Sequence, residues 1–344
     1  MSSTFTMIGG EGPNSYRQHS KYQGALVEAA KEKINEAIST KLNIDLTSNN
    51  LANIADFGCS TGPNTFFAIQ TILDAVENKY QQDIEFQVFF NDSSNNDFNS
   101  LFKTLPPTRK YFATGVPGSF FGRVLPRNTL HVGVSSFSIH FVSMIPKEFK
   151  NRDSPLWNKD IYCTGFSKKI EKLYLDQYKI DMEIFLNVRA QELMSSGLLL
   201  LLGGCLPNGV KMSETVNGMM TDIIGSSLSE IAKKGIIDQK RLDTFKLLVY
   251  FAQVDVLKQI IEDNGCFTIE VFEKISHANG EYPLDHEYLT LSFKATVGGS
   301  VASQFGQDAM EKTFELVKEK TQEMLPQIAK AKPGFQYLIV LRKN

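Results

Sequence analysis

The chain has 344 residues, of which 42% are hydrophobic, so it can bury the core of one large domain or of one domain with a cap. Its formal net charge is −2 and lysine and arginine form no dense run, which argues against a protein that binds nucleic acid through phosphates. Because no secretory signal, membrane-spanning run or C-x-x-C pair occurs, we expect a reduced cytoplasmic protein that does not insert into membranes.

The first predicted elements lead to a ligand-binding turn. The first twenty residues are polar and rich in glycine, and we expect them to fold as a lid over a site. Apolar residues at helical spacing predict a helix over 22–42. A short strand then ends in Asp56, and a turn with Gly58 and Gly62 leads into a helix that begins at Pro63. Strand, glycine turn and helix together are typical of nucleotide sites in α/β sheets.

The spacing of the glycines restricts the choice of nucleotide. Gly58-x-x-x-Gly62 matches neither the dinucleotide pattern G-x-G-x-x-G nor a phosphate-binding P-loop. An acid such as Asp56 beside this turn suits a cationic ligand without phosphates, such as S-adenosylmethionine (SAM). A second strand-like run, 86–92, ends in Asp92, which is suited to bind ribose hydroxyls. Either acid alone is more often a solvated strand end or a helix cap, but the two together favour SAM.

Further strands are predicted at 110–113 and 130–134, and a short helix at 96–102. The segment 115–122 between these strands is rich in glycine and aromatic residues and is predicted to be a flexible loop. Because open α/β sheets bind ligands at the carboxyl ends of their strands, we expect the segments that follow the strands to converge on one site.

The second half of the chain departs from the alternation of strands and helices. A long amphipathic helix over 168–196 and a buried strand at 198–202 still fit a doubly wound, Rossmann-like α/β sheet. The remaining predicted elements are helices at 216–234, 255–264 and 308–330 and strands at 267–273 and 335–341. We therefore expect a SAM-binding core of residues 1–210 plus 331–344, and a mainly helical cap of residues 211–330 over the ligand edge.

Short motifs along nearly the whole chain resemble those of the plant SABATH methyltransferases. This family transfers a methyl group from SAM to small carboxylic acids or to the nitrogen of xanthine alkaloids. The motifs are Met7–Tyr16, Ile54–Asn64, Phe90–Asp92, Asn96–Asn99, Gly115–Phe120, Leu130–Ser138, Trp157–Lys159, Arg189–Glu192 and Leu242–Phe245. Within the family, the chain is most similar to the farnesoic acid carboxyl-O-methyltransferase branch. The resemblance implies an enzyme that esterifies a small lipophilic acid, and it implies a homodimer.

The resemblance also implies roles for individual residues. The contacts to SAM would be Tyr16, Asp56, Cys59, Asn64, Asp92, Ser93, Ser119, Phe120, Ser136 and Phe137. The catalytic positions that orient the acceptor carboxylate would be Gln23, His140 and Phe141, and Thr221, Phe293, Thr296 and Phe335 would complete the acceptor pocket. Some members hold a magnesium ion near the positions of Asn158, Asp243 and Phe245. Without the resemblance, these aromatic and histidine side chains would be interpreted as core residues.

Three departures from the family pattern bear on function. Salicylate-type members carry tryptophan where this chain has Phe141, and a phenylalanine has no N–H group for the carboxylate. The usual tyrosine is replaced by Phe137. Lys246 stands where the magnesium motif often has asparagine, and a lysine amine is no oxygen ligand. With Thr221, the smaller Phe141 predicts a roomier apolar pocket, which favours a long terpenoid-like acid such as farnesoic acid over flat salicylate.

The predicted reaction needs no general base. A carboxylic acid has a reference pKa near ~4, so it is already an anion at neutral pH. The protein then has to orient the two reactants and to exclude water. The alternatives are a methyltransferase for another acid (salicylate, benzoate, jasmonate or indole-3-acetate) or for a nitrogen acceptor, and a SAM-binding paralogue with little activity. A dehydrogenase is disfavoured because the dinucleotide glycine pattern is absent.

Overall fold

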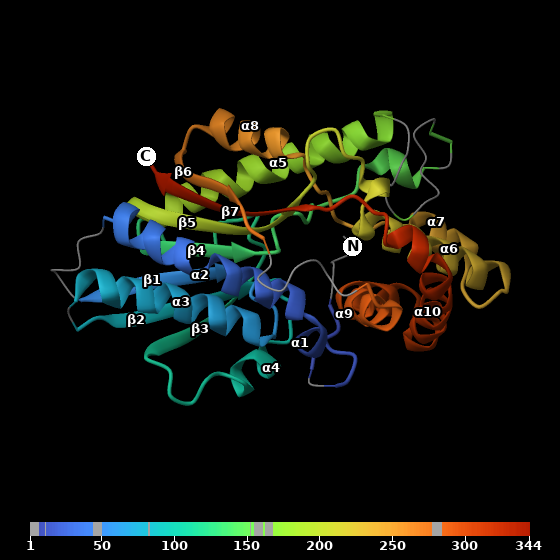
Figure 1. Ribbon diagram of the computed structural model, residues 1–344, viewed down its shortest axis with the longest axis horizontal. Coiled ribbons are helices and arrows are strands. Elements are labelled where there is room, and N and C mark those ends of the chain that lie inside the picture. Colours follow the sequence, from blue (N-terminus) through green and yellow to red (C-terminus); the bar gives the residue numbers. More distant parts are fainter. Residues whose placement is uncertain are drawn as a thin grey trace.

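A seven-stranded sheet forms the centre of the computed structural model, which describes residues 7–10, 12–43, 50–81, 83–151, 153–154, 161, 168–276 and 284–344 (Figure 1). The strands are β1 (Leu51–Phe57), β2 (Glu85–Asp92), β3 (Tyr111–Pro117), β4 (Leu130–Ser136), β5 (Leu193–Cys205), β6 (Phe267–Lys274) and β7 (Phe335–Lys343). Their order is β3-β2-β1-β4-β5-β7-β6, and the first five are parallel while β7 is antiparallel to both of its neighbours. The doubly wound sheet that the sequence predicts is confirmed.

Helices cover both faces of this sheet. They are α1 (Tyr16–His19), α2 (Lys21–Lys41), α3 (Pro63–Tyr80), α4 (Phe98–Lys103), α5 (Lys168–Glu192), α6 (Val216–Lys233), α7 (Gln239–Thr244), α8 (Val254–Asn264), α9 (His286–Phe305) and α10 (Gln307–Ile328). Strand β5 serves two cores, because Leu199 and Leu201 pack with α5 and α8 while Leu198, Leu200 and Leu202 pack with α2 and α3. A continuous apolar run is what a strand covered on both faces requires.

Helices α6, α9 and α10 pack together beyond the carboxyl ends of the parallel strands (Figure 1). The N-terminal segment joins this group to the sheet. The N–H of Ile8 donates to the carbonyl of Ala295 on α9 (3.0 Å), and the carbonyl of Ile8 accepts from the N–H of Tyr16 (2.9 Å). A Cβ atom at Gly298 would lie 2.9 Å from the Ile8 side chain, so a glycine allows this close approach.

The structure corrects several predicted boundaries. Helix α5 ends at Glu192 rather than at residue 196, because β5 already begins at Leu193 beside β4. Strand β3 continues to Pro117 into the predicted loop, since an edge strand tolerates glycine and proline. Helix α9 was not predicted, because its apolar residues surround the helix and Gly298 interrupts its middle. Among the residues described, no helix has the length and apolarity that a membrane crossing requires.

Candidate active site

The glycine turn after β1 is bonded to the end of β2. Gly58 has a φ of +90°, and a Cβ atom there would overlap with the hydroxyl of Ser138, so only glycine fits. The N–H groups of Gly58 and Cys59 donate to the carbonyl of Asn91, at 2.8 and 3.0 Å. Ser60, with a φ of +52°, donates its N–H to the carboxylate of Asp92 at 2.7 Å. The turn and the second acid are therefore held together, as the sequence predicts.

Asp92 lies at the junction of β2 and β3. Its second carboxylate oxygen accepts from the N–H of Ser93 at 2.7 Å, and its carbonyl accepts from the N–H of Gly118 at 2.8 Å. The side-chain amide of Asn91 donates to the carbonyls of Val116 (2.7 Å) and Gly118 (3.0 Å). Burial raises the pKa of Asp92, and the hydrogen bonds from the backbone oppose this shift. The ends of three neighbouring strands thus form one bonded unit.

A cavity of about 310 Å³ opens at these strand ends. Its lining combines polar groups, among them the carboxylate of Asp92, with apolar side chains that include Phe141 and Leu248. The complete lining is Met7, Gly9, Gly58, Ser60, Thr61, Asp92, Ser93, Asn95, Asn96, Asp97, Ser119, Phe120, Phe121, Ser138, Phe141, Val142, Ser143 and Leu248. Five residues that the sequence predicts as site residues, Asp92, Ser93, Ser119, Phe120 and Phe141, are among them. The cavity suits a ligand with a polar and an apolar end.

Asp56 is buried beside this lining and is not part of it. One carboxylate oxygen accepts from the hydroxyl of Thr65 at 2.5 Å, and the other has no hydrogen-bond partner. Burial, with the charge of Asp92, raises the pKa of Asp56 to about 7. Burial and these two carboxylates also raise the pKa values of Tyr16 and Cys59, so all four groups lie near one another. A cation placed here would relieve the repulsion between the acids.

Three further residues that the sequence predicts as SAM contacts bond within the chain. The amide of Asn64 donates to the carbonyl (2.9 Å) and the hydroxyl (3.0 Å) of Ser20, which ties α3 to the start of α2. The carbonyl of Ser136 accepts from Ser138, and Phe137 has a φ of +52° with its ring centroid 5.8 Å from that of Tyr22. None of the three lines the described cavity. Their contact with SAM remains a prediction.

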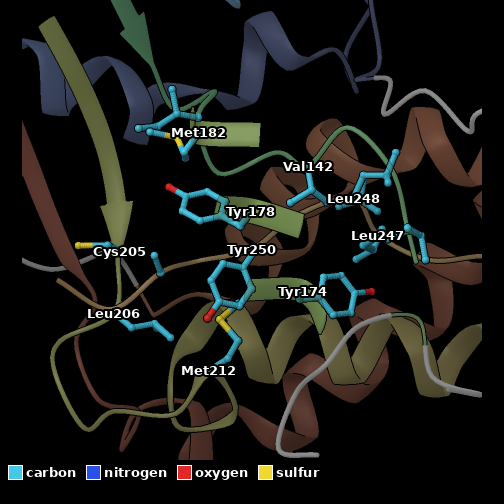
Figure 2. Packing of buried hydrophobic residues seen from close by; sticks show 14 of the residues in the cluster. Val142, Tyr174, Tyr178, Met182, Cys205, Leu206, Met212, Leu247, Leu248 and Tyr250 are labelled. Atoms are coloured by element: carbon cyan, nitrogen blue, oxygen red, sulfur yellow. The ribbon is translucent and has the colours of Figure 1, made fainter. Parts of the chain in front are cut away.

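The apolar wall of the cavity comes from two segments that are far apart in the sequence. Val142 donates its N–H to the carbonyl of Leu248 (2.9 Å), and Tyr250 donates its N–H to the carbonyl of His140 (2.7 Å). The side chains of Val142 and Leu248 lie close together, and the ring of Tyr250 lies nearby in the same buried cluster (Figure 2). The ring of Tyr250 in turn packs against Tyr178, with centroids 5.3 Å apart. This pairing was not predicted.

His140 is held between two aromatic rings. Its ring stacks on Phe251 with centroids 4.8 Å apart and an interplanar angle of 16°, and it contacts Phe141 with centroids 4.5 Å apart. Burial lowers the pKa of His140 to about 4, so the imidazole is neutral at pH 7. A neutral imidazole can donate one hydrogen bond, which suits the predicted contact with a carboxylate.

Ser143, which the sequence analysis missed, extends the apolar wall. Its N–H and its hydroxyl donate to the two carboxylate oxygens of Asp181, at 2.7 and 2.6 Å. The amide of Gln177 donates to the same carboxylate at 3.0 Å. Burial raises the pKa of Asp181 against these hydrogen bonds. The carboxylate therefore anchors the cavity wall to α5.

Of the predicted acceptor contacts, only Phe141 lines the described cavity, so His140 and the remaining residues do not. The side-chain oxygen of Gln23 is buried without a hydrogen-bond partner. The hydroxyls of Thr221 and Thr296 donate to carbonyls of their own helices, α6 and α9, at 2.7 and 2.9 Å. Phe293, on α9, and Phe335, at the start of β7, are partly buried in the larger core. Their contact with the acceptor remains a prediction.

Two of the three positions that the resemblance assigns to magnesium are described, and their oxygen atoms accept hydrogen bonds from other residues of the chain, a lysine ammonium among them. Asn158 lies outside the described residues. Asp243 is buried and accepts from the amide of Gln239 at 2.9 Å. The ammonium of Lys246 donates to the carbonyls of Asp243 (2.7 Å) and Phe245 (3.0 Å). The described part of the chain holds no group of three or more acidic, histidine or cysteine side chains that could bind a metal.

An unpredicted ion pair supports the aromatic loop of the cavity. The guanidinium of Arg189 donates to the carbonyls of Phe120 (2.9 Å) and Gly122 (2.8 Å). The carboxylate of Glu192 accepts from the N–H of Val124 at 2.6 Å and from Arg189 at 2.9 Å. The sequence analysis placed both residues in one family motif but predicted a role for neither.

Comparisons with known proteins agree over the full length. A family model described as "SAM dependent carboxyl methyltransferase" matches residues 2–344. Farnesoic acid carboxyl-O-methyltransferase of Arabidopsis thaliana is 77% identical over 100% of both chains, and paraxanthine methyltransferase 2 of the same plant is 55% identical over 98% of each. A solved structure of loganic acid methyltransferase with SAH is 40% identical, covers 98% of this chain and 99% of its own, and has a TM-score of 0.93.

Proposed function

Because the chain belongs to the SABATH family of SAM-dependent carboxyl methyltransferases, we propose that it forms the methyl ester of a small lipophilic carboxylic acid, with farnesoic acid as the best-supported acceptor. The observation that carries the proposal is one cavity that joins the acidic strand end at Asp92 to the apolar wall of Phe141 and Leu248. The first side suits the polar nucleoside of SAM and the second suits a hydrocarbon chain. The name of the 77% identical relative supports the same acceptor.

The polar side of the cavity would bind SAM. Asp92 would accept hydrogen bonds from the ribose hydroxyls, and Ser119 and Phe120 would lie against the base. The raised pKa of Asp56 indicates an acid that a cationic ligand would bring to its charged form. Such a ligand would also counter the mutual repulsion of Asp56 and Asp92. Of the residues assigned here, Asp56 alone does not line the cavity.

The chemistry is one in-line displacement. A carboxylate oxygen uses a lone pair to form the new O–CH3 bond while the bond from that carbon to sulfur breaks, and its electron pair remains on sulfur. The products are a methyl ester and a neutral thioether, and no proton moves. The residues of this chain therefore have to hold the carboxylate, which His140 and Gln23 would do with neutral donors, and to exclude water with the wall at Phe141.

A nitrogen acceptor is the second candidate, and the 55% identity to paraxanthine methyltransferase 2 favours it. Transfer to a xanthine N–H group requires that a base accept a proton. The pKa of His140, lowered to about 4, makes this imidazole a weak base. A carboxylate, which arrives as an anion, matches the neutral surroundings of His140 better.

We also propose a cytoplasmic homodimer with a separate cap. The described cysteines Cys59, Cys205 and Cys266 are free thiols, which fits a reducing compartment. The homodimer rests on the family resemblance.

Within residues 211–330, α8 and β6 contact each other, and β6 pairs with β7 in the sheet. Of the cap predicted as 211–330, the proposal therefore keeps 211–253 and 284–330 and assigns α8 and β6 to the core.

The test is transfer of a labelled methyl group from SAM to a panel of acceptors: farnesoic, salicylic, benzoic, jasmonic and indole-3-acetic acids, with paraxanthine as the nitrogen acceptor. We expect one dominant methyl ester, that of farnesoic acid, identified by mass spectrometry. Binding of SAH is measured in parallel to establish that the protein is folded. An N-methyl product alone, or no ester from any acid while SAH binds, would contradict the proposal.

A further inference from the structure

The segment from Asp243 to Tyr250 connects α7 to the wall of the cavity. Leu248 lines the cavity, and its carbonyl accepts from the N–H of Val142. Further along, the N–H of Tyr250 donates to the carbonyl of His140. The position of this segment therefore determines where the apolar wall stands and how His140 is held.

A buried ammonium fixes the beginning of the segment. Lys246 is 3% exposed, and its Nζ lies 2.7 Å from the carbonyl oxygen of Asp243 and 3.0 Å from that of Phe245. A buried charge is costly unless polar partners surround it, and here two main-chain oxygens converge on it. Main-chain carbonyl oxygens are also ligands of hard divalent cations. The two carbonyl oxygens thus bind a cation, as they would in a metal site, but here the cation is the ammonium group of Lys246.

We propose that the Lys246 ammonium replaces the magnesium ion that the family resemblance implies near Asn158, Asp243 and Phe245, so that this chain orders the segment without a metal. The ammonium already uses the carbonyls of Asp243 and Phe245. A divalent ion beside it would meet a like charge at close range in a site shielded from water. Magnesium also requires a near-complete octahedron of oxygens, to which a lysine contributes none.

The wild-type protein provides the first test. The protein is dialysed against MgCl2, freed of unbound metal by gel filtration and analysed for magnesium by plasma mass spectrometry. We expect substoichiometric magnesium, and the same Tm in EDTA as in MgCl2. One tightly bound magnesium per chain, or a Tm that falls in EDTA, would overturn the proposal. These readouts do not depend on the acceptor, so they stand apart from the test of methyl transfer.

The substitution Lys246→Asn provides the second test, because it removes the ammonium and supplies an amide oxygen. We expect its Tm in EDTA to lie about 5 °C or more below that of the wild type, and MgCl2 to restore part of this loss. Lys294→Met is the matched control, because Lys294 is also buried, at 8% exposure, but pairs with Glu311 at 2.5 Å. Its Tm should be the same in both buffers.

A Lys246→Asn protein that is as stable as the wild type in EDTA would overturn the proposal, and so would one whose Tm ignores magnesium while its fold is intact. If this variant does not fold, the metal content and EDTA response of the wild type still decide the question. A magnesium response of the same size in Lys294→Met would show a general effect of the salt and would also count against the proposal.

Discussion

Arg189 and Glu192 form an ion pair, with 2.7 Å between Nε and a carboxylate oxygen, in which both side chains are fully buried. The guanidinium also lies over the ring of Phe57, 4.0 Å from its centroid. Through its bonds to Phe120 and Gly122, the pair holds the aromatic loop of the cavity against the end of α5. The loop that lines the cavity is thereby fixed by two charged side chains that do not line the cavity themselves.

Replacing Arg189 should destabilise the protein strongly. Arg189→Met leaves the carboxylate of Glu192 buried without its partner, and breaking such a pair costs about 3–5 kcal/mol. Urea unfolding at neutral pH measures the loss. Lys172→Met is the matched control, because Lys172 and Asp176 form an exposed pair on the same helix, which is worth less than about 1 kcal/mol. Equal losses of unfolding free energy in the two variants would show that the buried pair stabilises the protein no more than the exposed pair does.

Much of the fold could be predicted because local patterns determine it. The apolar run 198–202 predicts a strand covered on both faces, and Pro63 predicts the start of α3; both predictions are confirmed. The Arg189–Glu192 pair could not be predicted, because oppositely charged residues three positions apart on a helix are usually exposed. Its burial depends on Phe57 and on the loop after β3, which local sequence does not reveal.

The candidate site likewise has one part that the sequence predicts and another that it does not. The convergence of the glycine turn with Asp92 follows from the rule that parallel strands present their carboxyl ends at one edge, and the structure confirms it. The wall formed by Val142 and Leu248 results from pairing between segments about a hundred residues apart, so no short motif contains it. The anchoring of Ser143 by Asp181 is equally non-local.

Asp56 should make stability depend on pH. Its pKa is about 7 in the folded protein and 3.8 when unperturbed, so the folded state holds a proton that the unfolded state releases between these values. The free energy of unfolding should therefore fall as the pH rises from about 4 to about 7 and level off above, with each unit of pKa shift worth about 1.4 kcal/mol. Urea unfolding over this range should show a shallower slope for Asp56→Asn. Parallel slopes for the two proteins would contradict the assignment.

Asp92 should be required for binding of the nucleoside. Asp92→Asn removes the charge and leaves one side-chain oxygen, which can accept from the N–H of Ser60 or of Ser93 but not from both. Affinity for SAH should therefore fall about 10-fold or more, since a hydrogen bond to a charged group is worth about 1.5–3 kcal/mol. Isothermal titration calorimetry measures the change. Asp97→Asn is the control: Asp97 also lines the cavity, but its carboxylate accepts from the N–H and hydroxyl of Ser100 and caps α4. It should lose less than about 1 kcal/mol of stability, because asparagine caps a helix about as well as aspartate, and it should retain its affinity.

His140 should act as a neutral donor. Because burial lowers its pKa to about 4, kcat/KM for the acid should show no step from His140 between pH 6 and 8. His140→Phe keeps a ring to stack on Phe251 but loses the N–H, so kcat/KM should fall about 10-fold, and His140→Gln should recover part of the loss. An unchanged kcat/KM in His140→Phe would assign this side chain to packing alone.

Phe141 should set the choice between long and flat acids. Its ring lines the cavity and contacts His140. Phe141→Trp adds an indole N–H for a carboxylate and fills space that a terpenoid chain would use. The ratio of kcat/KM for salicylate to that for farnesoate should therefore rise about 10- to 100-fold, because a change of this size in a pocket is worth about 1–3 kcal/mol.

Phe121→Trp is the matched control, because Phe121 lines the cavity from the loop after β3 and packs on Phe120. It should change kcat/KM for both acids alike, because Phe121 belongs to the loop that Arg189 holds and not to the segment of His140 and Phe141. If the ratio stays constant in Phe141→Trp, the acceptor carboxylate does not bind at this wall, and the position of the acid in the cavity has to be assigned to other residues.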